Sequence, residues 1–124
     1  MGGHKMRDLR ISRALFYLGL SPRHKGFHYI SAAISGLLNG LNMGEALDRV
    51  REDAKDDPKQ FDRCMRYAIN YAWDVAGGGI RSLFPGFTVP PSPKEFIFAM
   101  QWELEDDAPP QKGSTDGRCS GPLA

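Results

Sequence analysis

Cysteine, histidine and long apolar runs are scarce in this chain of 124 residues. Two cysteines, Cys64 and Cys119, cannot form a disulfide framework, and the three histidines do not combine with them at zinc-ligand spacings. No apolar run approaches the roughly 20 residues of a membrane helix, and the N-terminus lacks the apolar stretch of a secretion signal. We therefore expect a cytoplasmic, single-domain protein with no cofactor, metal or membrane partner.

The residue patterns of common enzymes are also missing. Gly77-Gly78-Gly79 lacks the lysine and hydroxyl residue of a phosphate-binding loop, and no strand precedes it. His24 and His28 have a helical spacing but are too few to hold a metal ion. The acids between residues 52 and 57 are expected to be exposed, without the separated pKa values that acid–base catalysis uses. We do not expect an enzyme.

Charge is distributed unevenly, although the formal net charge is only +1. The first third of the chain is basic, whereas residues 45–57 and 103–107 are acidic. A basic segment can meet phosphate groups, but an exposed charged face is the commoner explanation of such a pattern.

Apolar residues recur at helical spacing and nowhere alternate convincingly, which predicts an all-α fold of about six helices. The expected helices are 7–18, 27–41, 44–55, 58–76, a short turn at 80–84, and 93–105. Ser92, Pro93 and Glu95 have the pattern of a capping box at the start of the last helix. We expect residues 1–6 to be flexible, 7–105 to form one domain, and 106–124 to be a disordered tail rich in acidic residues, Gly, Pro and Ser.

The segment from Asp57 to residue 76 is the most informative. Asp57 can cap a helix, Pro58 suits its first position, Gln60 completes a capping box, and the glycines at 77–79 end the helix. One face is apolar and includes Cys64, which we expect in the core. The opposite side carries groups that bind phosphates and base edges: Lys59, Arg63, Arg66, Tyr67 and Asn70. A merely solvated face is the alternative, because most amphipathic helices have one.

The short predicted helix 44–55, a tight turn and the longer helix 58–76 have the outline of a helix-turn-helix. That outline alone is weak, since any helical bundle contains pairs of helices.

Short segments along the chain match one known family in order and near its spacing. They are residues 18–19, 25–30, 33–35, 63, 66, 68–69, 72–73, 82–84, 86–89, 95–97 and 100. Together they resemble the C-terminal DNA-binding effector domain of the stage 0 sporulation protein A response-regulator family, over residues 7–105. The resemblance implies about six helices around a helix-turn-helix, a winged-helix-like effector bundle without a substantial sheet, with 58–76 as recognition helix.

The resemblance also implies a transcriptional regulator in sporulation that binds specific sequences of double-stranded DNA. Residue by residue, the family's DNA-contacting face falls on Gln60, Asp62, Arg63, Arg66 and Tyr67. Both arginines match in type, and a guanidinium can bind guanine or clamp a phosphate. Asp62 can accept from a cytosine amino group. Gln60 stands where the family has an arginine, and Tyr67 where it has a histidine. The resemblance therefore does not indicate which DNA sequence this chain prefers. With the residues of the exposed face, the expected DNA-binding set is Lys59, Gln60, Asp62, Arg63, Arg66, Tyr67 and Asn70. A homodimer on DNA, RNA polymerase and a full-length regulator are further candidate partners.

The sequence departs from the family in two ways, and the first of them, together with the near-neutral net charge, favours a second hypothesis. Glu52 and Asp53 stand where the family has a lysine pair, and Asp56 and Asp57 replace threonines of the turn; carboxylates there oppose binding to phosphates. The helical domain also begins within ten residues of the start, so we expect a free-standing effector domain without a phosphoacceptor receiver domain. The alternative is a protein-interaction module that kept the fold but lost DNA affinity, acting as a competitor or adaptor of a full-length regulator or RNA polymerase.

Overall fold

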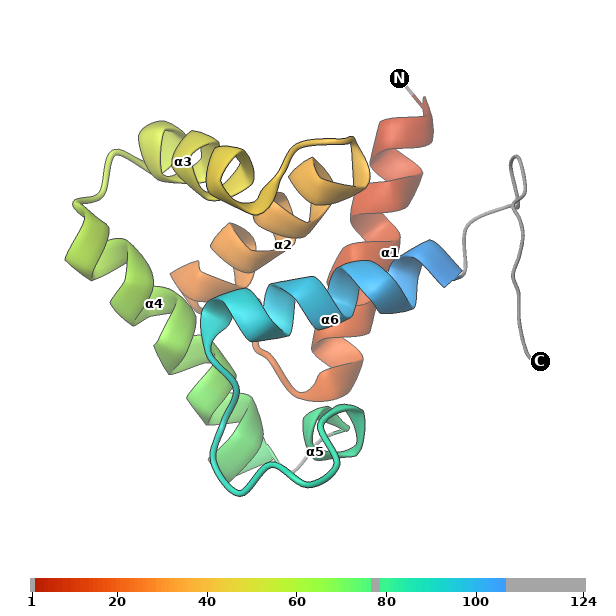
Figure 1. Ribbon diagram of the computed structural model, residues 1–124, viewed down its shortest axis with the longest axis vertical. Helices are drawn as coiled ribbons and strands as arrows, with labels where there is room; N and C mark the ends of the chain where they lie inside the picture. The colour runs from red at the N-terminus through yellow and green to blue at the C-terminus, as the bar shows by residue number, and fades with distance from the viewer. Residues whose placement is uncertain (1, 77–78, 107–124) are drawn as a thin grey trace.

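The computed structural model describes residues 2–76 and 79–106, and all the regular structure in these two ranges is helical (Figure 1). The elements are α1 (Gly2–Leu18), α2 (Lys25–Leu38), α3 (Met43–Ala54), α4 (Pro58–Tyr71), a π-helical turn (Ala72–Ala76), α5 (Ile80–Leu83) and α6 (Pro93–Asp106). The prediction of an all-α fold is confirmed. Residues 77, 78 and 107–124, which include most of the expected tail and Cys119, lie outside the described residues.

The helix at the centre of the fold is α2, which packs against α1, α3, α4 and α6. In Figure 1 it lies between α1 on one side and α4 on the other, with α6 crossing in front. Apolar residues at three- and four-residue steps give α2 a wide apolar face that no single partner helix could cover. Its buried residues are Gly26, Phe27, Ile30, Ala33, Ile34 and Leu37.

Two helices approach each other closely at Gly26, in the first turn of α2. A Cβ atom built there would lie 2.0 Å from the carbonyl oxygen of Cys64 and 2.9 Å from the Cα atom of Met65. Both atoms belong to the backbone of α4, so they cannot move aside as a side-chain end could. Glycine is the residue that allows the two backbones to meet, and it fixes where α4 crosses α2.

Side-chain caps define the starts of three helices. The Ser92 hydroxyl accepts from the Glu95 N–H at 3.2 Å, and the Glu95 carboxylate accepts from the Ser92 N–H at 2.8 Å, so the predicted capping box of α6 is confirmed. Asn42 and Glu45 form a second box at α3. At α4 the Asp57 carboxylate accepts from the Gln60 N–H at 2.8 Å. Only this half of the predicted box forms, because the Gln60 amide points instead to the Cys64 sulfur at 3.6 Å.

Several helix boundaries differ from the predicted ones. The second helix runs from Lys25 to Leu38 rather than over 27–41, and three others are shifted by one residue. The first helix begins at Gly2 rather than at residue 7, so it includes residues that we expected to be flexible. The predicted helix 58–76 is α-helical only to Tyr71 and continues as the π-helical turn. Arg81 from α5 reaches this turn: its Nε donates to the Trp73 carbonyl oxygen at 3.1 Å, and its guanidinium carbon lies 4.6 Å from the Trp73 ring centroid. A regular α-helix would pair that carbonyl with residue 77, so the contact with α5 supports the wider turn.

The Gly26→Ala substitution should destabilise the fold by about 3 kcal/mol or more, because the new methyl group collides with the backbone of α4. Urea unfolding followed by circular dichroism measures the loss. Gly44→Ala is the matched control, since Gly44 is exposed in α3 and its added Cβ would meet only the Asn42 Oδ1 atom, at 3.5 Å. The control should be neutral or slightly stabilising. Equal stability of the two variants would contradict the close α2–α4 contact.

Candidate nucleic-acid interface

The connection between α3 and α4 is a three-residue turn. Lys55 ends α3 in the left-handed backbone region (φ 61°), with its N–H bonded to the Arg51 carbonyl at 2.9 Å. Asp57 then caps α4. Both helices pack on α2, so the turn and the shared support together fix the direction in which α4 leaves α3.

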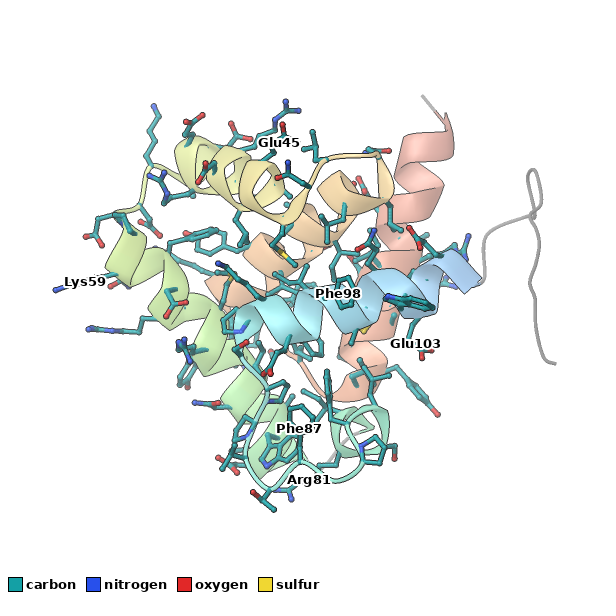
Figure 2. All side chains as sticks on the ribbon, in the orientation of Figure 1. Glu45, Lys59, Arg81, Phe87, Phe98 and Glu103 are labelled. Atoms are coloured by element: carbon teal, nitrogen blue, oxygen red, sulfur yellow. The ribbon has the colours of Figure 1, made fainter. Side chains whose placement is uncertain are left out.

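The two faces of α4 separate by chemistry as the sequence predicted. Phe61, Met65, Ala68 and Ile69 are buried. Six of the seven predicted DNA-binding residues are exposed, and Asp62 is half-buried. A shallow groove of about 410 Å³ runs along this outer face, and Lys59 points away from the body of the protein (Figure 2). The groove is lined by six of the predicted residues: Lys59, Asp62, Arg63, Arg66, Tyr67 and Asn70.

The two arginines differ in their surroundings. Arg63 is exposed, and no acid within the described ranges pairs with it. Arg66 donates from Nε to Asp62 Oδ2 at 2.6 Å, while its side chain stays 56% exposed. An exposed pair four residues apart on a helix contributes only about 0.3–0.5 kcal/mol, so a phosphate or base can displace it at low cost. The spacing of Asp62 and Arg66 predicts this pair, which our sequence analysis did not include.

The acids of the turn are not all exposed, which corrects our expectation. Asp56 is turned toward α2, where its carboxylate accepts a hydrogen bond from the Tyr29 hydroxyl at 2.5 Å and lies 3.8 Å from the Lys25 ammonium. The Asp56 side chain is only 18% exposed. This hydrogen bond, helped by burial and by the negative charge of Asp56, raises the pKa of Tyr29 to about 12. The Asp57 carboxylate is used as the cap of α4.

Glu52 and Asp53, at the end of α3, remain exposed, and neither forms an ion pair with a described residue. Of these four acids, Asp56 and Asp57 therefore make contacts within the fold, whereas Glu52 and Asp53 do not.

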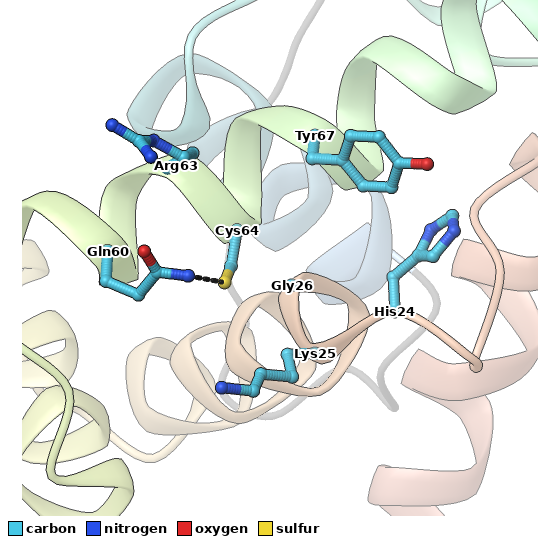
Figure 3. A pocket seen from close by; sticks show the side chains of 7 residues that line it. All are labelled: His24, Lys25, Gly26, Gln60, Arg63, Cys64 and Tyr67. Atoms are coloured by element: carbon cyan, nitrogen blue, oxygen red, sulfur yellow. Dashed lines mark hydrogen bonds between the residues drawn. The ribbon is translucent and has the colours of Figure 1, made fainter.

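The first residues of α2 also face α4, and the sequence analysis missed them. His24, Lys25 and Gly26 line a pocket of about 310 Å³ together with Gln60, Arg63, Cys64 and Tyr67 (Figure 3). The His24 ring meets the Tyr67 ring edge-on, with centroids 4.8 Å apart. The basic run Arg23-His24-Lys25 before a helix start was the available signal.

Cys64 lies in this pocket and is only half-buried, so its predicted place in the core is wrong. The close approach of Gly26 explains the difference. It brings the backbone of Cys64, rather than its side chain, against α2. The thiol is left beside the helix crossing, where the Gln60 amide reaches it.

The described ranges hold no group of three or more His, Cys, Asp or Glu residues that could bind a metal ion. No helix in them is long and apolar enough to cross a membrane. No protein-family model matches the sequence.

Tyr29→Phe should destabilise the protein by about 1 kcal/mol at neutral pH, because it removes the hydrogen bond to Asp56. The loss should depend on pH. The folded pKa of Tyr29 is raised to about 12 from an ordinary value of 10, so the stabilisation is complete below pH 10 and disappears as pH rises through 12. Denaturant unfolding of wild type and Tyr29→Phe at pH 8, 10 and 11.5 measures this, and a gap that widens above pH 10 would contradict the assignment.

Proposed function

We propose that the protein is a sequence-specific DNA-binding module, a transcriptional regulator that inserts α4 into the major groove. The observation that carries the proposal is the exposed groove along α4, in which Arg63 is unpaired among the described residues. An α-helix fits the width of the major groove, and a guanidinium can donate two hydrogen bonds to guanine O6 and N7. The α3–turn–α4 connection and the resemblance to the sporulation effector domain support this use of α4.

The exposed groups of α4 divide into two classes of contact. Lys59 is in the first turn and is suited to a phosphate, whereas Gln60 and Asn70 can bind adenine N6 and N7 with their amides. Arg66 can exchange Asp62 for a phosphate, because their surface pair is weak. The His24–Lys25 end of α2 lies beside Arg63 and Tyr67 at the edge of the same surface, where the Lys25 ammonium is 3.8 Å from Asp56.

Arg63→Ala should weaken binding to cognate promoter DNA by about 1–3 kcal/mol and relax base preference. Gel shifts at several salt concentrations measure both effects. Arg13→Ala is the control: Arg13 is exposed on α1, which lies across the molecule from α4 in Figure 1. The control should keep both affinity and preference. No shift at low salt, or equal loss in the two variants, would reject the proposal.

The exposed Glu52 and Asp53 favour a second candidate, a protein-interaction module that lost DNA affinity and acts on a full-length regulator or RNA polymerase. Their position beside the turn would place uncompensated negative charge near a DNA backbone.

The double substitution Glu52→Gln and Asp53→Asn separates the two candidates. For a DNA-binding protein it should raise affinity several-fold at low salt and less at high salt, because two repulsive charges near phosphates are removed. Fluorescence anisotropy with a labelled duplex measures this change. If neither wild type nor the double variant binds DNA, and a pull-down with wild type retains RNA polymerase or the regulator, the interaction module is the function.

A further inference from the structure

Two large aromatic side chains of α6 lie in solvent. Phe98 is 54% exposed and Trp102 is 60% exposed, although the opposite side of the same helix buries Phe96, Ile97 and Met100. The two residues are one helical turn apart, so they share one face. In Figure 1 α6 crosses the front of the molecule, and no other described helix covers it. Adjacent exposed aromatics rimmed by polar residues are typical of an interaction surface.

The charges at the two ends of this face are complementary to each other. Lys94 lies one turn before Phe98, and Glu105 lies one turn after Trp102; both are exposed. Lys94 has no acidic partner among the described residues, and Glu105 accepts only a hydrogen bond from the Gln101 amide, at 3.2 Å. About 11 residues of helix separate them, roughly 16 Å, so they cannot pair within one chain.

A second copy of α6, packed antiparallel, would both cover the exposed aromatic residues and provide a partner of opposite charge for each end of the face. With a two-fold axis near the middle of the helix, Phe98 of one copy faces Trp102 of the other, because the two positions are symmetric about that axis. The same axis brings Lys94 of each copy next to Glu105 of the other, which gives two equivalent ion pairs. An interface related by a two-fold axis needs such a self-complementary patch.

We propose that α6 forms a two-fold homodimer through the face of Lys94, Phe98, Trp102 and Glu105. The face shares no residue with the groove on α4, so the dimer can form without DNA and leaves that groove open. A buried aromatic residue covers about 150–250 Å², and these side chains are already half-buried in the monomer. The contact is therefore smaller than the ~1,600 Å² of a standard interface, and we expect a weak dimer with Kd on the order of 10–100 μM.

Analytical ultracentrifugation of the full chain without DNA tests the proposal. The average mass should rise from 13.8 kDa toward twice that value with increasing protein concentration. Trp102→Gln should raise Kd about tenfold or more, because an aromatic anchor is lost. Phe16→Gln is the matched control, since Phe16 is 66% exposed on α1, and it should leave Kd unchanged. A monomer at all concentrations would overturn the dimer and leave a different protein as the partner of this face.

Charge reversal identifies the partners across the axis. Lys94→Glu alone and Glu105→Lys alone should each weaken the dimer about threefold to tenfold, because like charges then meet, and the double reversal should restore it. Both reversals suit the helix dipole, so loss of α6 would not explain a weaker dimer, and circular dichroism checks this. Failure of the double reversal to restore the dimer would overturn the antiparallel arrangement. An equal effect of Phe16→Gln would do the same and assign the contact to α1.

Discussion

The contact between the backbones of α2 and α4 at Gly26 is the constraint on which the rest of the structure depends. No side chain separates the two helices at this point, so their backbones are in direct contact there. This contact fixes the position at which α4 crosses α2. That crossing determines which residues of α4 face outward. Phe61, Met65 and Ala68 turn toward α2 and the core, and the groove from Lys59 to Asn70 is left on the outside. The same crossing displaces the Cys64 side chain to the edge and brings His24 to Tyr67.

Local features of the fold could be predicted from the sequence because short-range chemistry decides them. The Ser92–Glu95 box, the Asp57 cap and the apolar face of α4 each depend on residues within a few positions of one another. Features that depend on residues far apart in the sequence could not be predicted in this way. Asp56 and Tyr29 are 27 positions apart, and no pattern relates them. The Trp73 carbonyl in the π-helical turn accepts a hydrogen bond from Arg81, which belongs to the next helix. The central position of α2 could not be predicted either, because it depends on how α1, α3, α4 and α6 pack around it.

The exposure of the candidate residues of α4 could be predicted from the sequence, but the ion pairs and hydrogen bonds of the nearby charges could not. Periodicity was enough to place Lys59, Arg63 and Tyr67 on one exposed face, because a helix converts spacing into direction. Whether each charge is available depends on its partners. Asp56 is bound to Tyr29, whereas Glu52 and Asp53 have no partner in the described part of the chain. A count of charges in the sequence treats these carboxylates alike, although Asp56 is bound into the fold and Glu52 and Asp53 are exposed.

The fold presents two different exposed surfaces on helices that both pack against α2. The exposed side of α4 is polar, whereas the exposed side of α6 carries two aromatic residues. The two surfaces share no residue, so a partner on one does not cover the other. If the proposed dimer and the proposed DNA contacts both form, the dimer would hold two α4 helices in one assembly, and two moderate DNA contacts would act at a high effective concentration. Each copy would then need fewer phosphate contacts of its own.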